Sequence, residues 1–334
     1  MTCIWDRRQL AVALAAAALL PARNAIAQIG QRQARRIGLM MAVSAEDPEG
    51  QARVEAFRQG LREARLRIGD DVILDVVWYK GDFQTARNEV AALLERGAEA
   101  LVVNGTPGMD AVRASAATVP VIFVVVSNPV GAGYVPNLSR PGGNVTGFST
   151  FEPEIAGKWL QLLRQLVPGM KNVAMLFDPR FAGFNSLWQA VEGTAPGHGI
   201  VPHAAHASSF DEMAAALAAI AGKEKAALIV SPSPINTVHR QKLIAMANEA
   251  RLPAIYPFRF YVRDGALIAY GFNAADQFRR AAGYAGRVLR GEKAGDLPVQ
   301  APRLFELGIN LKTARQIGFS VPEALLLAAD EIVE

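Results

Sequence analysis

The chain has 334 residues, 51% of them hydrophobic, which is enough to bury one large core or two ordinary ones. Its 35 lysines and arginines nearly balance 31 aspartates and glutamates, and without a basic block this charge argues against nucleic-acid binding. The single cysteine, Cys3, excludes a disulfide framework and a cysteine metal site.

Residues 1–27 predict a signal peptide rather than part of the fold. Arg7 and Arg8 form a positive start, residues 10–20 are an unbroken apolar run, and Ala-Ile-Ala at 25–27 supplies a cleavage site. The apolar run is shorter than the about 20 residues that span a bilayer, so a cleaved leader is favoured over a membrane anchor. The paired arginines fit the twin-arginine export route as well as the general secretory route. We expect a periplasmic protein.

From residue 36 onward, strands alternate with helices. Short apolar runs predict strands at 36–43, 72–79, 100–105 and 119–126. The helices between them are expected to begin near Pro48, Thr85 and Met109. Because the strand runs are apolar on both faces, they predict a parallel sheet covered by helices on both sides.

The same alternation begins again at residue 155. Strands are predicted at 172–177, 200–207, 227–231 and 253–257, with helices at 155–166, 186–194, 211–221 and 238–251. Two consecutive sets of this size predict an α/β protein with two doubly wound, Rossmann-like lobes. The remaining elements, at 266–271, 277–290 and 305–310, are too few for a third domain and are expected to cross back between the lobes.

A glycine-rich stretch, SRPGGNVTG at 139–147, falls where the first set ends and the second begins. It lacks the lysine and the spacing of a phosphate-binding loop. Gly142 and Gly143 permit backbone angles that are closed to other residues, and Pro141 stiffens the approach. We therefore expect a hinge at Gly142, Gly143 and Asn144, with an ordinary turn-rich loop as the alternative.

Two stretches carry a resemblance to a known family. SNPVGAGYVPNLSRPGGNVTGFS (127–149) resembles the central signature of periplasmic substrate-binding proteins of ABC transporters, some of which take up tryptophan, tyrosine or phenylalanine. The run from residue 279 to Glu334 is similar to that family's carboxyl end almost throughout. The resemblance implies a type I periplasmic binding fold, with three crossing segments and a ligand between the lobes. The expected lobes are 34–146 with 271–302, and 147–270 with 303–334.

One position departs from the pattern of that family. Members commonly carry an aspartate before the Pro-Val of the first signature, where this chain has Asn128. If this side chain faces the ligand, the site lacks a negative charge that could pair with an ammonium group. The resemblance implies an aromatic amino acid or a related carboxylate as ligand, and Asn128 puts the amino-acid specificity in question.

Candidate ligand-binding residues follow from the rule that open parallel α/β sheets bind ligands beyond the carboxyl ends of their strands. In the first lobe these ends supply Ser44, Trp78, Asn104, Gly105, Thr106, Ser127 and Asn128. In the second lobe they supply Asp178, Ser231, Ser233, Tyr256 and Tyr270. The two tyrosines lie near the crossings, where closure of the lobes would bury them.

The turn at Thr106 is the most informative of these. Thr106 is expected to cap a helix whose first residue is Pro107, which leaves the amides of Gly108 and Met109 for a carboxylate. An ordinary capped helix is the alternative.

Several other candidate ligand-binding residues have a purely structural role as the alternative. Trp78 could pack against a helix instead of a ligand, Asp178 could only begin a turn, and Ser231 and Ser233 lie in a proline-rich turn.

The sequence shows no motif for catalysis or for a metal. His203 and His206 are an odd number of residues apart on a predicted strand and would face opposite sides, with no carboxylate or cysteine close by. Gly147 begins a stretch that fails the nucleophile elbow at its last position, and no dinucleotide motif follows the first strand. We expect no cofactor, no metal and no enzymatic activity.

These observations predict a monomeric receptor that captures a small solute, closes by hinge motion and delivers the solute to an ABC permease with its ATPase. A periplasmic sensor subunit that feeds a chemoreceptor or kinase is the alternative. A DNA-binding regulator with the same core needs a helix-turn-helix before the first strand, where this chain has only the leader.

Overall fold

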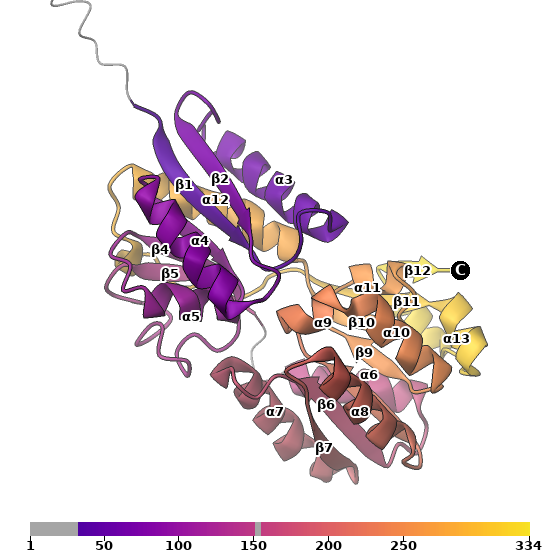
Figure 1. The fold of residues 1–334 in the computed structure, drawn as a ribbon. Coiled ribbons are helices and arrows are strands. Elements are labelled where there is room, and N and C mark those ends of the chain that lie inside the picture. Colours follow the sequence, from indigo (N-terminus) through magenta and orange to yellow (C-terminus); the bar gives the residue numbers. More distant parts are fainter. Residues whose placement is uncertain (1–32, 151–154) are drawn as a thin grey trace, which may run out of the picture.

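The computed structural model describes residues 33–150 and 155–334, which form two α/β lobes (Figure 1). The signal peptide predicted at residues 1–27 lies outside the described residues. Within the described ranges, no helix combines the length and the apolar character needed to cross a membrane.

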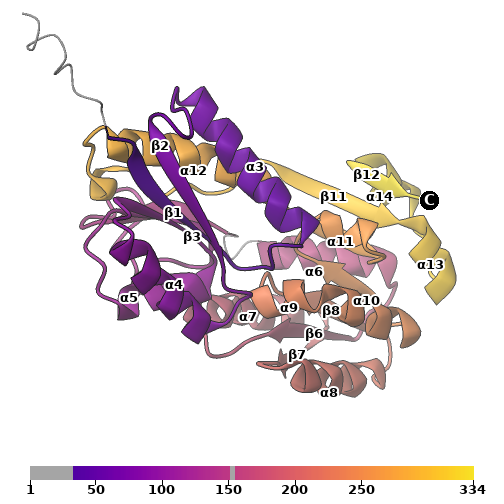
Figure 2. The same ribbon diagram turned by 45° about the horizontal axis from the view of Figure 1, so that its top comes forward.

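The first lobe is built on a five-stranded parallel sheet with the order β2-β1-β3-β4-β5. Its strands are β1 (Arg35–Met41), β2 (Val72–Trp78), β3 (Ala100–Asn104), β4 (Val121–Val126) and β5 (Val145–Ser149). One face is covered by α3 (Pro48–Glu63) and α12 (Ala274–Leu289), the other by α4 (Phe83–Glu95) and α5 (Thr106–Ala114) (Figure 2). Along β1, Leu39 packs with the first pair of helices and Met40 with the second, as the apolar runs predicted.

The second lobe contains a seven-stranded sheet with the order β12-β11-β10-β9-β8-β6-β7, in which only the β10–β11 pair is antiparallel. Its strands are β6 (Asn172–Phe177), β7 (Val201–His206), β8 (Ala226–Val230), β9 (Ala254–Tyr256), β10 (Ile268–Phe272), β11 (Phe305–Asn310) and β12 (Glu331–Val333). Its helices are α6 (Ile155–Leu166), α7 (Ala182–Thr194), α8 (Phe210–Ala221), α9 (Pro234–Val238), α10 (Arg240–Glu249), α11 (Phe260–Arg263), α13 (Leu311–Ile317) and α14 (Glu323–Ala328). Short 3₁₀ helices occur at η1 (Ala195–His198) and η2 (Ala294–Asp296).

The chain passes between the lobes three times: after β5, between β10 and α12, and between η2 and β11. These crossings are hydrogen-bonded to one another. The Ser149 N–H donates to the Gln300 carbonyl at 2.9 Å, and the Asn273 N–H donates to the Leu304 carbonyl at 3.0 Å. The buried Gln277 side chain donates to the Ser149 carbonyl at 2.7 Å. Movement of one lobe against the other therefore bends three linked segments together.

The first crossing lies one strand later than the sequence predicted. Gly142, Gly143 and Asn144 precede β5, and β5 pairs with β4 in the first sheet, so the first lobe extends through Ser149. The Gly142 N–H donates to the Gly295 carbonyl, and the Asn144 amide donates to two carbonyls of the first lobe. Both glycines have left-handed φ angles of 68° and 58°, as expected, but they form the turn into β5 and not the crossing itself.

The boundary of the second crossing also shifts slightly. Gly271 and Phe272 belong to β10 of the second sheet, so the return to the first lobe begins at Asn273 instead of residue 271.

Candidate functional site

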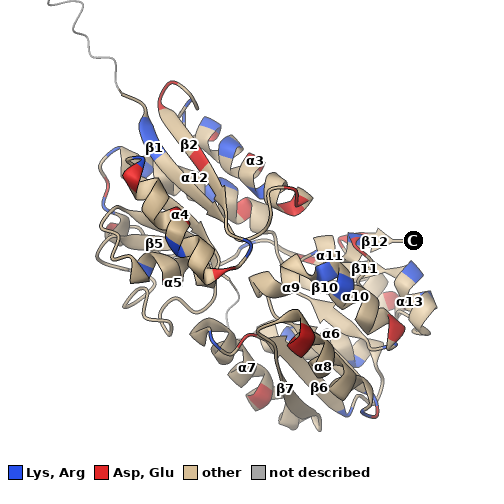
Figure 3. Ribbon diagram, viewed as in Figure 1, with Lys and Arg blue, Asp and Glu red and all other residues tan. Residues whose placement is uncertain are grey.

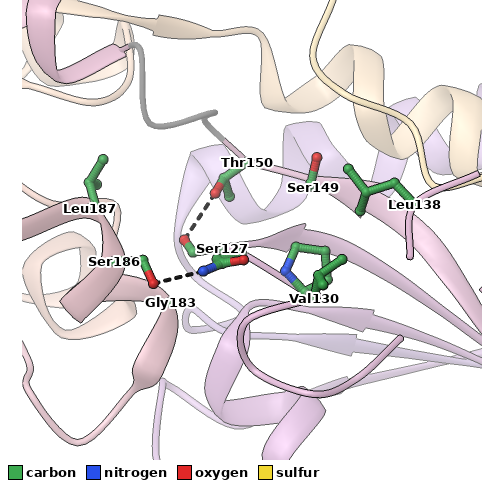
Figure 4. A pocket seen from close by; sticks show the side chains of 10 residues that line it. Ser127, Val130, Leu138, Ser149, Thr150, Gly183, Ser186 and Leu187 are labelled. Carbon is green, nitrogen blue, oxygen red and sulfur yellow. Dashed lines mark hydrogen bonds between the residues drawn. The ribbon is translucent and has the colours of Figure 1, made fainter. Parts of the chain in front are cut away.

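Two cavities lie between the lobes, at the carboxyl ends of strands. The larger, of about 190 Å³, is bounded by the ends of β4 and β5 and by the start of α7 (Figure 4). It is lined by Ser127, Asn128, Pro129, Val130, Leu138, Ser149, Thr150, Gly183, Ser186 and Leu187. The smaller, of about 20 Å³, is lined by Ala42, Val43, Arg53, Asn104, Gly105, Thr106, Val125, Phe184, Pro232, Pro234, Thr237 and Phe258. Both cavities have walls from both lobes.

Hydroxyl and amide groups dominate the polar surface of the larger cavity. The Asn128 Nδ2 donates to the Ser186 Oγ at 2.7 Å, which joins the first lobe to the second (Figure 4). The Thr150 Oγ1 donates to the Ser127 Oγ at 2.9 Å. Asn128 adopts a left-handed φ of 40°, and its Oδ1 accepts the Gly131 N–H. Asn128 thus faces the opposite lobe and lines the larger cavity, and its contact with a ligand stays a prediction.

A single charged side chain, Arg53 on α3, lines the smaller cavity. Arg53 is only 3% exposed, and its Nε donates to Glu49 at 3.3 Å. Its Nη2 has no hydrogen-bond partner among the described residues. The guanidinium lies over the rings of Phe258 and Phe260 of the second lobe, with centroids at 5.4 and 5.9 Å. An arginine of the first lobe is therefore enclosed by aromatic rings of the second.

The two lobes are in direct contact around these cavities. Arg240 of α10 donates to Asp47, the N-cap of α3, through Nη1 at 2.6 Å and Nη2 at 3.2 Å. A methyl group added at Gly183 of α7 would lie 2.4 Å from the Ser127 carbonyl oxygen, so only glycine allows this approach. The cleft is closed in this structure.

Five of the predicted ligand residues are brought together at the cavities: Asn104, Gly105, Thr106, Ser127 and Asn128. The Asn104 side chain is buried, and it accepts the Ala42 N–H at 3.3 Å and donates to the Val124 carbonyl at 3.4 Å. It therefore ties the ends of β1 and β4 together beside the smaller cavity.

The predicted amide cradle at the start of α5 is wrong in detail. Gly105, with φ of 86°, is the N-cap, and Thr106 is the first helical residue, so Pro107 stands one position later than expected. The Met109 N–H donates to the Gly105 carbonyl at 3.2 Å, and the buried Tyr79 hydroxyl, which donates to the Asn104 carbonyl, lies beside Gly108. The Met109 amide is therefore used within the fold and is not left for a carboxylate.

Asp178 is held by its own lobe. It is 1% exposed, accepts a hydrogen bond from Arg180 at 2.6 Å and one from Ser208 at 3.2 Å, and lines neither cavity. The hydrogen bond to Asp178 raises the pKa of Arg180. The turn-forming alternative for Asp178 is the one that the structure favours.

The other predicted contacts also lie outside both cavities. Trp78 packs against Gly50 of α3, and the Ser44 carbonyl accepts the Asp47 N–H. Ser231 accepts a hydrogen bond from Asn236.

The remaining candidates from the second lobe are placed in the same way. Ser233 precedes α9, where its carbonyl accepts the Thr237 N–H. Tyr270 stacks on Phe305 with ring centroids 5.9 Å apart.

Tyr256 offers a direct test of its predicted role. It is buried, stacks on Tyr261 at 5.0 Å, and its hydroxyl has no hydrogen-bond partner among the described residues. Burial raises its pKa above the ordinary value. Because an unpaired buried hydroxyl costs about 1 kcal/mol or more, Tyr256→Phe should raise the melting temperature by about 2 °C and leave ligand affinity unchanged. Tyr261→Phe is the control and should lower the melting temperature, since it removes a hydrogen bond to Thr237. A loss of affinity in Tyr256→Phe would instead restore its predicted ligand contact.

Sequence reasoning missed Arg53, Phe184, Thr237 and Phe258. Arg53 lies on a helix and not at a strand end, and a charged residue in a helix normally faces solvent. A signal was present, however, since Arg53 stands three residues after buried Gly50 and four before buried Phe57, on the apolar stripe of α3.

Within residues 33–150 and 155–334, no three His, Cys, Asp or Glu side chains gather in a metal-binding arrangement. His203 bonds to Asn172, and His206 packs edge-on against Phe177.

Relatives of known structure share this architecture. A conserved domain protein from Vibrio cholerae O1 biovar El Tor matches with a TM-score of 0.83 and 27% identity, over 90% of this chain and all of that one. A Streptococcus pneumoniae domain in complex with L-Trp also gives 0.83, with 23% identity over 90% of this chain and 100% of that one. The ligand-free, open structure of a Clostridium difficile substrate-binding protein gives only 0.66, with 22% identity over 90% and 99%. The lower score with an open structure agrees with the lobe contacts seen here.

The sequence comparisons agree with the fold. The tyrosine-binding protein of Clostridioides difficile strain R20291 is 24% identical over 302 residues, which cover 89% of this chain and 84% of that protein. The profile of the family described as ABC transporter substrate binding protein matches residues 37–333. The predicted α/β fold of two lobes, of the type I periplasmic binding class, is confirmed. The chain belongs to the family of ABC transporter substrate-binding proteins.

Proposed function

We propose that this protein is the exported receptor of an ABC importer, which captures a small solute between its lobes and delivers it to the permease. The observation that carries the proposal is the pair of cavities at the strand ends, walled by both lobes. Ligands of open α/β sheets bind at this place. The signal peptide predicted from the sequence would bring the chain to the periplasm, where such a receptor works.

The proposed ligand is an aromatic amino acid or a related carboxylate. A relative is named for tyrosine binding, and a structural neighbour is in complex with L-Trp. Phe184 supports the aromatic part of this proposal, because it lies next to Gly183 of the larger cavity and aromatic rings pack favourably against one another.

Capture would work as a shift of population between open and closed arrangements. The Asp47–Arg240 pair and the Asn128–Ser186 hydrogen bond join opposite lobes, so they form only when the cleft is closed. A solute that touches both walls adds its own contacts to the closed form alone. Its differential affinity for that form drives closure.

Two measurements test the proposal. The first is a thermal-shift measurement on the purified protein, stripped of carried-over ligand by unfolding and refolding. The panel contains amino acids, carboxylates, sugars and nucleosides, and one compound class should raise the melting temperature. A ligand at 100 times its Kd adds about 2.7 kcal/mol to the free energy of unfolding. Cells lacking the gene should then lose uptake of the same labelled compound. Binding without loss of uptake would overturn delivery to a permease.

A further inference from the structure

The described residues on the walls of the two cavities carry one charge, and it is positive. Among the described residues that line either of them, Arg53 is the only charged side chain, and no aspartate or glutamate is present. The other polar groups of these lining residues are hydroxyls, side-chain amides and backbone groups. Among the described lining residues, the guanidinium of Arg53 is therefore the one charged group that faces a ligand.

Arg53 differs from the other arginines of its helix. Charges of both signs are spread along α3 (Figure 3), and the side chains of Arg58 and Arg62 are 41% and 59% exposed. The Arg53 side chain is 3% exposed, and its Nε donates to Glu49 at 3.3 Å, while its Nη2 has no hydrogen-bond partner among the described residues. A buried guanidinium normally has its donors satisfied, because an unpaired buried donor loses its hydrogen bonds to water without replacement. The Nη2 group is such a donor, on the wall of the smaller cavity.

The nearby carboxylates already have partners. Asp47 binds Arg240 of the opposite lobe, Glu49 binds the Arg53 Nε, and Asp178 binds Arg180. At Asn128, on the larger cavity, the side chain is a neutral amide bonded to Ser186. A ligand that carries an ammonium group would find no carboxylate among the described residues of these walls, and burying that charge without a partner is costly.

We propose that the ligand is a carboxylate without a charged amine, and that Arg53 binds its carboxylate through the Nη2 group. This inference rests on the proposed receptor function and narrows its ligand. A guanidinium pairs strongly with a carboxylate because its hydrogen bonds are charge-assisted. Thr106 and Thr237 line the same cavity. The cavity, of about 20 Å³, has no room for a ring.

The body of the ligand extends toward the larger cavity. The two cavities are adjacent: Val125 of one and Ser127 of the other stand at the end of β4, and Phe184 and Gly183 are neighbours at the start of α7. The apolar body of the ligand then lies along Phe184, toward the aliphatic residues around Leu187.

Four compounds with the same phenyl ring test the contributions of the carboxylate and of the ammonium group to binding. Isothermal titration of the purified protein would use 3-phenylpropanoate, L-phenylalanine, 3-phenylpropanamide and 2-phenylethylamine, with 4-methylpentanoate and L-leucine as an aliphatic pair. We expect at least one of the two carboxylates to bind at least tenfold more tightly than the corresponding amino acid. The neutral amide should bind at least 100-fold more weakly than 3-phenylpropanoate, and the amine should not bind.

Variants of Arg53 identify the anchor. Arg53→Gln should remove the preference for the carboxylate over the amide, whereas Arg53→Lys, which keeps the charge, should retain part of it. Arg58→Gln, on the exposed face of the same helix, is the matched control and should leave both affinities unchanged. The ratio of the two affinities is measured within each variant, so partial unfolding of Arg53→Gln does not imitate the effect.

The remaining outcomes decide between the two proposals. Tighter binding of L-phenylalanine or L-leucine than of its carboxylate would overturn this inference and leave the receptor intact. A carboxylate preference that survives in Arg53→Gln would also overturn it. Binding of a sugar or nucleoside from the wider panel, with no response to any carboxylate, would do the same and still support a receptor. No response to any compound would count against both.

Discussion

Replacing Gly183 by alanine should weaken ligand binding by about tenfold or more while the second lobe stays folded. The added methyl group would lie 2.4 Å from the Ser127 carbonyl oxygen and 2.7 Å from its Cβ, both in the opposite lobe. Overpacking of this kind typically costs about 1–3 kcal/mol, and each 1.4 kcal/mol changes an equilibrium about tenfold. Gly183 lies in the first turn of α7 with an ordinary helical backbone, where alanine is the better helix former. The penalty therefore falls on closure and not on folding.

A second glycine of the same helix supplies the control. A Cβ added at Gly193 has no heavy atom within 4 Å, so Gly193→Ala changes helix propensity without touching the other lobe. Affinity is measured by isothermal titration and the extent of closure by small-angle X-ray scattering with saturating ligand. The melting temperature should rise or stay constant in both variants. If Gly183→Ala binds and closes as the control does, the contact between α7 and the end of β4 plays no part in ligand capture.

Local patterns were sufficient to predict the strands and helices but not the position of the first crossing. The runs at 100–105 and 119–126 became β3 and β4 because their residues are buried on both faces. The glycine-rich turn at 139–147 gave the left-handed angles at Gly142 and Gly143 correctly. Whether the next strand joins the first sheet or the second depends on its pairing with β4, a long-range contact that the turn itself does not encode.

More of the predicted residues line the cavities in the first lobe than in the second, for a similar reason. The rule about strand ends locates residues, but the direction of each side chain depends on its neighbours. Thr106 and Ser127 line the cavities, whereas Asp178 turns to Arg180, only two residues further along the chain. That rule does not select Arg53, because Arg53 lies on α3 and not at a strand end, although it lines the smaller cavity.

Replacing Asp47 by asparagine should weaken ligand binding by about ten- to a hundredfold. Asp47 forms a bidentate pair with Arg240 across the cleft, and the two side chains are only 7% and 12% exposed. Hydrogen bonds to charged groups contribute about 1.5–3 kcal/mol, and a pair shielded from water is weakened little by salt. Arg240 keeps its hydrogen bond to Asp264 at 2.6 Å. The loss of binding free energy is therefore smaller than for a buried charge left without any partner.

Asp47 has a second role as the N-cap of α3. The asparagine variant keeps this cap while it removes the charge that pairs with Arg240 across the cleft. The Asp47 Oδ1 accepts the Glu49 N–H at 3.0 Å, and asparagine caps helices about as well as aspartate. Asp82 caps α4 in the same way, with its Oδ1 accepting the Thr85 N–H at 2.7 Å, but it lies on the surface. Asp82→Asn is therefore the matched control, and isothermal titration of both variants with the same ligand should weaken only the first. Equal affinities would mean that the Asp47–Arg240 pair does not differ between the open and ligand-bound forms, and closure would then rest on the contacts of α7 and of the ligand itself.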